Sequence, residues 1–130
     1  MKQNTIDHAH RLLTARKPDW SLDQPFYVDS DFFDMEMELF FNRQWLFAAM
    51  TCEIPTPGDW VRVDIGRESI ILLRTKDGEI AAYHNTCRHR GSRICLAESG
   101  HATRVVCPYH QWSYELNGRL LRTRLMGDAF

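Results

Sequence analysis

Two short clusters of cysteine and histidine constrain the fold of this 130-residue chain more than any other feature. They are Cys87-Arg-His89 and Cys107-Pro-Tyr-His110, and 17 residues separate His89 from Cys107. The first cluster follows an apolar segment that ends near His84, and the second follows the apolar segment 102–106. Each cluster is therefore expected on a loop. Two loops from neighbouring hairpins can converge on one site while the sheet beneath holds them rigid.

Two thiolates and two imidazoles suit two kinds of metal centre. One is a tetrahedral Zn²⁺ site with two cysteines and two histidines. The other is a Rieske [2Fe–2S] cluster, in which two histidines replace two cysteines on one iron. Zinc sites of this composition usually begin with a pair of cysteines two to four residues apart. Here each loop offers one cysteine and one histidine, and this spacing favours the cluster while leaving zinc as the alternative.

Short apolar segments separated by turn residues predict a mainly β, antiparallel sandwich or barrel-like domain. Asp77-Gly78 and Asn117-Gly118 are typical of tight hairpin turns. Strands are expected at 45–51, 60–65, 69–75, 80–84, 102–106, 113–116 and 119–121.

The N-terminal part of the chain predicts helices that pack against this β domain. A short amphipathic helix is expected over 4–17, and an extended segment over 18–29. A second helix is expected to begin with Ser30 as its N-cap. Its large apolar residues lie three and four positions apart, on one face that is expected to cover a sheet: Phe33, Met37, Phe40 and Phe41.

Charge and hydropathy exclude several classes of protein. The 16 basic and 17 acidic residues give no basic excess, so no nucleic-acid partner is expected. No apolar run approaches the roughly 18 residues that cross a membrane, and the N-terminus lacks the apolar core of a secretory signal. A cytoplasmic protein without a membrane partner is expected, and in that compartment four cysteines favour metal binding over disulfides.

The two clusters and their surroundings resemble a known family. Cys87-Arg-His-Arg-Gly91 and Cys107-Pro-Tyr-His-Gln-Trp-Ser-Tyr114 are similar to the Rieske domain of ring-hydroxylating-type oxygenase α subunits. The segments Glu53-Ile-Pro-Thr-Pro-Gly-Asp59 and 77–85 match the same family. The pair Gln111-Trp112 is most similar to members that act on quaternary ammonium compounds, such as betaine-type demethylases.

The resemblance implies a Rieske-type fold in which two hairpin loops hold the cluster. Cys87 and Cys107 would bind one iron, and His89 and His110 the other. It implies no catalytic residue within the chain. The residues expected to surround the ligands and tune the centre are Arg90, Gly91, Pro108, Tyr109 and Trp112.

The family also implies a division of labour. Residues 45–130 would form the Rieske domain, and residues 1–44 a helical and extended segment packed on it. The domain would be the electron-entry part of a mono- or dioxygenase that hydroxylates or demethylates a small molecule. The mononuclear Fe(II) would lie in a C-terminal domain that this chain lacks, so the chain would not be catalytic alone.

A flavin reductase or a ferredoxin would supply electrons to this centre. A catalytic domain of the same or a neighbouring subunit would receive them, in a homotrimer of the full-length protein. The alternative is a free-standing Rieske ferredoxin, an electron carrier that is not part of an enzyme. The 44 residues before Trp45 disfavour it, because a minimal carrier does not need them.

The remaining cysteines and histidines are given structural roles. Cys52 and Cys95 are expected to be buried free thiols. His84 is expected to pack or form a hydrogen bond at a strand end, and His101 is not expected to be a ligand. Four arginines near the loops are expected to form a solvated rim or ion pairs with their neighbours: Arg88, Arg90, Arg93 and Arg104. The alternative is an electrostatic role, in which they favour the reduced centre and attract an acidic donor.

Overall fold

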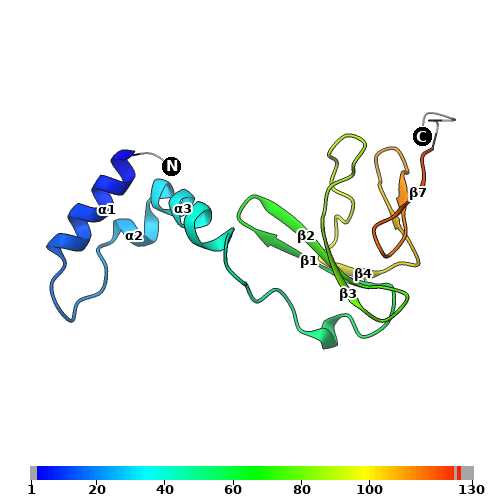
Figure 1. Ribbon diagram of the computed structural model, residues 1–130, viewed down its shortest axis with the longest axis horizontal. Helices are drawn as coiled ribbons and strands as arrows, with labels where there is room; N and C mark the ends of the chain where they lie inside the picture. Colours follow the sequence, from blue (N-terminus) through cyan, green and yellow to red (C-terminus); the bar gives the residue numbers. More distant parts are fainter. Residues whose placement is uncertain (1–2, 125, 127–130) are drawn as a thin grey trace. The chain divides into compact units, whose positions relative to one another are not determined.

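The computed structural model describes residues 3–124 and 126, which belong to two units, Met1–Phe47 and Ala48–Phe130. The first unit contains the helices and the second contains all the described strands (Figure 1). The fold is therefore mainly antiparallel β with a few helices, as the sequence predicts.

The N-terminal unit begins with helix α1 (Gln3–Ala15), which confirms the predicted first helix. Helix α2 (Pro25–Val28) is a single turn inside the segment predicted to be extended. Helix α3 (Ser30–Glu36) continues into a π-helical turn, Met37–Phe41. The N-cap of α3 is Asp29 and not Ser30, because the Asp29 carboxylate accepts a hydrogen bond of 2.8 Å from the backbone N–H of Asp31.

Within the first unit, the apolar face predicted for this helix is not the buried one, and its predicted packing on a sheet stays a prediction. Phe33, Phe40 and Phe41 are exposed, and Phe32 is the buried aromatic residue, with 1% of its surface exposed. Phe32 stacks against Phe26 of α2 with ring centroids 4.9 Å apart and contacts the ring of His8 of α1 at 5.3 Å. The short helix α2, which the sequence does not predict, supplies the stacking partner and so decides which phenylalanine lies inside.

The second unit is built on a four-stranded antiparallel sheet. Its strands are β1 (Asp59–Ile65), β2 (Glu68–Arg74), β3 (Ile80–His84) and β4 (Ser99–His101). They follow the order β3-β2-β1-β4, so β2 and β1 occupy the centre. The predicted strands at 60–65, 69–75 and 80–84 are confirmed. The sequence misses β4, where Gly100 lies flat on the indole of Trp60 in the paired strand.

A second, smaller sheet contains β5 (Val105–Val106), β6 (Ser113–Tyr114) and β7 (Leu120–Arg122), in that order. The predicted strand at 102–106 is therefore reduced to two residues, and 102–104 serve as a connection.

No strand forms at 45–51, where one was predicted. The chain instead enters a 3₁₀ turn at Thr51–Glu53. The guanidinium of Arg74 donates hydrogen bonds to the carbonyls of Ile54 at 2.9 Å and Thr51 at 3.3 Å. These bonds hold the turn and the buried Ile54 against the sheet, while Trp45, Phe47 and Met50 of the predicted strand are exposed.

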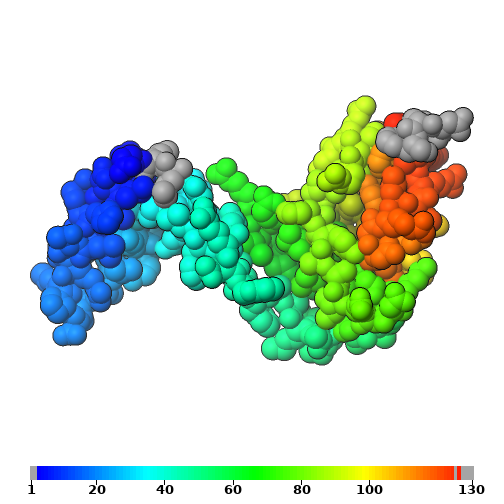
Figure 2. Space-filling view, in the orientation of Figure 1, coloured from blue at the N-terminus to red at the C-terminus, as the bar shows by residue number. Residues whose placement is uncertain are grey.

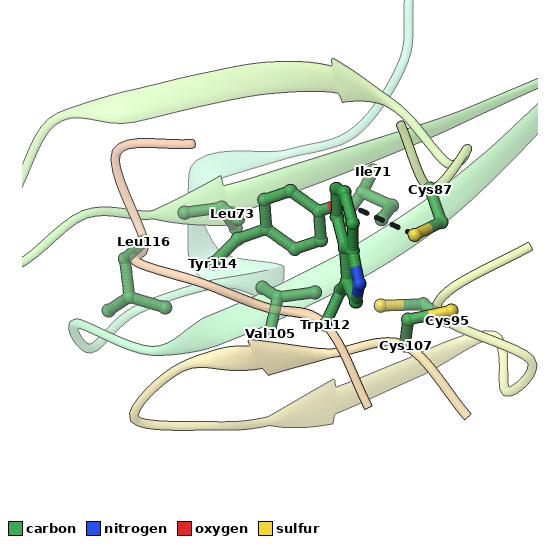
Figure 3. Close-up of a cluster of buried hydrophobic side chains, with 9 residues drawn as sticks. All are labelled: Ile71, Leu73, Cys87, Cys95, Val105, Cys107, Trp112, Tyr114 and Leu116. Carbon is green, nitrogen blue, oxygen red and sulfur yellow. Dashed lines mark hydrogen bonds between the residues drawn. The ribbon is translucent and has the colours of Figure 1, made fainter. Parts of the chain in front are cut away.

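The hydrophobic core of the second unit lies between its two sheets (Figure 3). Cysteines, aliphatic residues and two aromatic residues from both sheets and both loops compose it: Ile71, Leu73, Cys87, Cys95, Val105, Cys107, Trp112, Tyr114 and Leu116. The two loop cysteines are thus part of the core and not of the surface. Among the described helices, none is long and apolar enough to cross a membrane.

Candidate metal centre

Two loops with the same backbone frame form the candidate site. In the first loop, residues 87–92, the N–H of Cys87 donates to the carbonyl of Ser92 at 2.8 Å, and the N–H of Gly91 donates to the carbonyl of Cys87 at 2.9 Å. In the second loop, residues 107–112, the pairs at the same offsets are Cys107 to Trp112 at 2.8 Å and Gln111 to Cys107 at 3.0 Å. Each frame places a cysteine at its first position and directs the following residues around it.

The fifth position of each frame has a positive φ, +69° at Gly91 and +60° at Gln111. Glycine adopts this conformation without strain, whereas a side chain makes it cost roughly 1–2 kcal/mol. The two loops therefore need the same turn, and Gln111 forms it at an energetic cost that its counterpart avoids.

The four candidate ligands come together at this pair of loops. Cys87 and Cys107 are each 2% exposed, and the rings of His89 and His110 lie with centroids 4.8 Å apart, nearly edge to face. Figure 1 shows the first loop and the second loop side by side at one end of the second unit. The two cysteine sulfurs lie on the core side, and the imidazoles are only partly buried.

Trp112 supports the histidine side of the site. Its indole is 4% exposed and stacks on the ring of His89, with centroids 4.7 Å apart and planes 7° from parallel. Partial burial lowers the pKa of His89 below its ordinary value, and the charges of His110 and Arg90 lower it further. A lowered pKa favours the neutral imidazole, which is the form that binds a metal.

Tyr114 is a functional candidate that sequence reasoning did not single out. Its hydroxyl lies 3.2 Å from the sulfur of Cys87 (Figure 3) and accepts the backbone N–H of Arg88 at 3.2 Å. Burial and the contact with Cys87 raise the pKa of Tyr114 to about 12, so the phenol keeps its proton and can donate to a thiolate. The sequence signal for this residue was its place in the strand expected at 113–116. A tyrosine that is buried on a strand usually needs a hydrogen-bond partner for its hydroxyl.

Asn85 is a second residue that the sequence reasoning missed. It is fully buried, and its amide donates to the carbonyl of Cys95 at 2.8 Å and to the hydroxyl of Ser69 at 3.2 Å. Its oxygen accepts the backbone N–H groups of Ile94 and Cys95 at 3.0 and 2.8 Å. Asn85 therefore ties both ends of the first loop to strand β2. An asparagine directly before a ligand loop is the sequence signal, since such side chains often bond to nearby backbone.

The other residues expected around the ligands occupy more open positions. Arg90, Pro108 and Tyr109 are exposed, although the ring of Tyr109 contacts that of His110 at 3.7 Å. A Cβ added at Gly91 would meet no atom within 4 Å, so this glycine serves its backbone conformation and not close packing.

The remaining cysteines lie outside the set of ligands. Cys52 is exposed, which corrects the expectation of a buried thiol, because the chain around it forms the 3₁₀ turn and not a strand. Cys95 is buried as expected, and burial raises its pKa to about 11, so it remains a thiol at neutral pH.

Two of the remaining histidines lie at strand positions and contact carboxylates. His101 on β4 contacts the carboxylate of Asp59 at 2.8 Å. His84 at the end of β3 lies 3.5 Å from the carboxylate of Glu68.

The donor set fits a binuclear cluster. Nδ1 of His110 is buried with no hydrogen-bond partner within the part of the chain that the structure describes, as expected of an atom reserved for a metal. Among residues 3–124 and 126, no three His, Cys, Asp or Glu side chains lie so that they could hold a single metal ion. A Rieske cluster does not require such a group, because each iron takes only two protein ligands.

Comparisons with known proteins agree with this geometry. The family model of the Rieske [2Fe-2S] domain matches residues 44–128. The glycine betaine monooxygenase oxygenase subunit of Chromohalobacter salexigens is 53% identical over 125 residues, which cover 95% of this chain and 28% of that one. The corresponding subunit of Pseudomonas aeruginosa is 48% identical over 110 residues, covering 85% and 26%.

A solved structure gives a similar result. Naphthalene 1,2-dioxygenase from Rhodococcus sp. bound to indole superimposes with a TM-score of 0.85 at 34% identity, covering 98% of this chain and 29% of that one. The chain thus spans less than a third of the length of each of these relatives.

Proposed function

The chain belongs to the Rieske [2Fe-2S] domain family, and from that premise we propose that it transfers single electrons within an oxygenase. Cys87 and Cys107 are the proposed ligands of one iron, and His89 and His110 those of the other. The observation that supports this assignment most strongly is the repeated loop frame, which buries one cysteine from each loop and brings the two imidazoles together.

A bound Rieske cluster accepts one electron and passes it on without making or breaking a bond. The residues of this chain set the conditions for that transfer. Tyr114 keeps its proton and directs its hydroxyl at the sulfur of Cys87, which favours the more negative, reduced centre. Trp112 is buried and stacks on His89, so it covers one face of that imidazole.

The proposed role places the chain at the electron entry of an oxygenase that acts on a small molecule. A flavin reductase or a ferredoxin would deliver the electron, and a mononuclear iron in a further catalytic domain would receive it. That domain would belong to the same or a neighbouring subunit of a homotrimer in the cytoplasm. The high identity to two glycine betaine monooxygenase subunits favours a quaternary ammonium substrate.

Within this proposal, residues 45–130 form the redox domain, and residues 1–44 form a segment that packs on it. Arg90, Gly91, Pro108, Tyr109 and Trp112 tune or shield the centre.

Anaerobic reconstitution with iron and sulfide tests the proposal. The expected product is red-brown and gives an electron paramagnetic resonance signal after one-electron reduction. A colourless protein that binds one Zn²⁺ per chain and takes up no cluster would overturn the proposal and favour a zinc module.

A further inference from the structure

A groove with a marked positive charge lies beside the second loop. It has a volume of about 350 Å³ and is lined by Arg104, Val106, Gln111, Ser113, Arg122 and Arg124, called here the arginine groove. All three arginines are exposed, and among the described residues that line the groove there is no carboxylate. Two arginines elsewhere in the same unit, by contrast, lie beside carboxylates: Arg93 is 3.9 Å from Asp64, and Arg119 pairs with Glu115.

The small sheet holds this groove in place. Ser113 on β6 pairs with Val106 on β5 and with Arg122 on β7, so three of the lining residues lie across adjacent strands. Figure 2 shows the segment that contains β6 and β7 (orange) at the surface of the second unit, next to the yellow-green segment of the first loop. The groove is thus part of a rigid surface at the loop end of this unit.

Gln111 connects the groove to the metal centre. It follows the proposed ligand His110 and adopts a φ of +60°, where the first loop has Gly91. Glycine forms the same turn in the first loop, so the turn itself does not require the side chain of Gln111. Its oxygen accepts a hydrogen bond from the guanidinium of Arg124 and so fixes that arginine over the groove. Strain of this kind at a non-glycine residue is typical of functional sites.

We propose that the arginine groove binds a carboxylate-rich surface of the redox protein that donates the electron. Guanidinium groups bind carboxylates in a two-pronged geometry, and an uncompensated positive groove steers an acidic protein toward it. A single small anion would gain little from such exposed charges, whereas a protein surface meets all three at once. This inference rests on the proposed electron-transfer function.

The step itself is a one-electron exchange. One electron leaves the reduced cluster of the donor, which is oxidised, and enters the Rieske cluster, which is reduced. No bond forms or breaks, and no proton is transferred. Plant-type [2Fe–2S] ferredoxins have lower potentials than Rieske centres, so the transfer from such a protein runs downhill.

The test measures how fast an acidic, reduced plant-type [2Fe–2S] ferredoxin reduces the reconstituted chain. Stopped-flow rates are compared at low and high ionic strength for the wild type, Arg122→Gln, Arg124→Gln and Gln111→Gly. Lys76→Gln, in the turn between β2 and β3, removes the same charge outside the groove and is the matched control. Photoreduction with deazaflavin, which needs no docking, reports independently that each variant carries a working cluster.

Each arginine variant is expected to slow reduction at low salt by about three- to tenfold, with a weaker dependence on ionic strength. Gln111→Gly is expected to slow it by about two- to threefold while leaving the free energy of unfolding equal or higher, because the strained φ is relieved. Lys76→Gln is expected to behave as the wild type. This combination would distinguish the groove from a general effect of net charge.

Wild-type rates in all three groove variants, or an equal loss in Lys76→Gln, would overturn the inference. So would sedimentation data in which the groove variants lose self-association but keep the wild-type rate, since the partner would then be a second copy. A wild type that is photoreduced but ignores ferredoxin at every ionic strength would overturn the docking alone. A wild type that neither reductant reduces would overturn the proposed function itself.

Discussion

The first loop, residues 87–92, and the second loop, residues 107–112, share a backbone frame but are supported in different ways. Asn85 anchors the first loop to strand β2 through buried hydrogen bonds. The second loop closes on the buried indole of Trp112. The left-handed position is glycine in the first loop and Gln111 in the second, and only the latter connects to an exposed arginine.

The two loops thus share the backbone frame and a buried cysteine, while the side chains around them make different contacts. The first loop is secured by polar contacts in the core and by the hydroxyl of Tyr114. The second carries groups at the surface that a partner can reach. The predictions below remove the shared features first and then the features particular to one loop or to the sheet beneath.

Replacing either buried cysteine is expected to have the largest effect. Cys87→Ser and Cys107→Ser should each abolish the visible absorption of the reconstituted chain, because in the proposed assignment both loops contribute one thiolate to the same iron. Absorption spectra and iron content after reconstitution provide the measurement. Cys52→Ser removes an exposed thiol and should keep the full spectrum. A cluster retained in either loop variant would show that the two loop cysteines are not equally required for cluster binding.

Removing Asn85, the polar anchor, tests the support that is particular to the first loop. Asn85→Ala leaves several buried backbone and hydroxyl groups unsatisfied and should lower the free energy of unfolding by about 2–4 kcal/mol. Asn117→Ala, where an exposed side chain accepts one hydrogen bond from the N–H of Arg119, should cost less than about 1 kcal/mol. Urea unfolding of the two variants compares them. Equal losses would mean that the network around Asn85 contributes no more than a surface turn.

The sequence predicts the most regular parts of this architecture. The strands 60–65, 69–75 and 80–84 follow from apolar segments bounded by turn residues, and the structure has them as β1, β2 and β3. The candidate ligands also follow from the sequence, since their spacing alone suggests two converging loops. The strand pattern and the spacing within each cluster are both local features of the sequence, so they can be recognised without knowledge of the tertiary contacts.

The features that the sequence does not predict depend on contacts between different elements. The segment 45–51 has the composition of a strand, but Arg74, more than 20 residues later, binds the carbonyls around the turn that follows it. The choice of Phe32 over Phe33 as the buried residue depends on the ring of Phe26. Tyr114 reaches the sulfur of Cys87 across 27 positions, a contact that no spacing rule indicates.

The hydroxyl of Tyr114 should distinguish the cysteines of the two loops electrochemically. Tyr114→Phe removes a hydrogen bond to the sulfur of Cys87 and should lower the midpoint potential by about 20–60 mV, the equivalent of one ordinary hydrogen bond. The direction follows because the bond stabilises the more negative, reduced state. Protein-film voltammetry gives the potential. The control is Tyr109→Phe, which keeps the ring beside His110, removes only the hydroxyl of an exposed residue and should leave the potential unchanged. A rise in the potential of Tyr114→Phe would reverse the assigned role.

The smallest expected effect concerns Asp59, the first residue of β1 in the larger sheet. The hydroxyl of Thr56, with His101 and the Thr56 N–H, lowers the pKa of Asp59 from 3.8 to about 2. A lowered folded-state pKa means that this carboxylate stabilises the fold above pH 3.8, and that the contribution is lost as the pH falls toward 2.

Asp59→Asn should therefore be less stable than the wild type at pH 5, and the gap should narrow as the pH falls toward 2. Thermal unfolding across that range, with Asp77→Asn as the control, provides the test. A gap independent of pH would remove Asp59 from this role.

Counting the histidine nitrogens bound to iron tests the central claim most directly. Electron–nuclear double resonance of the reduced chain, reconstituted after labelling its histidines with ¹⁵N, should show two histidine nitrogens in the wild type. His89→Cys and His110→Cys should each show one, with the cluster retained, because each loop provides one imidazole to the same iron. Two nitrogens in either variant, or none in the wild type, would contradict the account of two matched loops that share one Rieske centre.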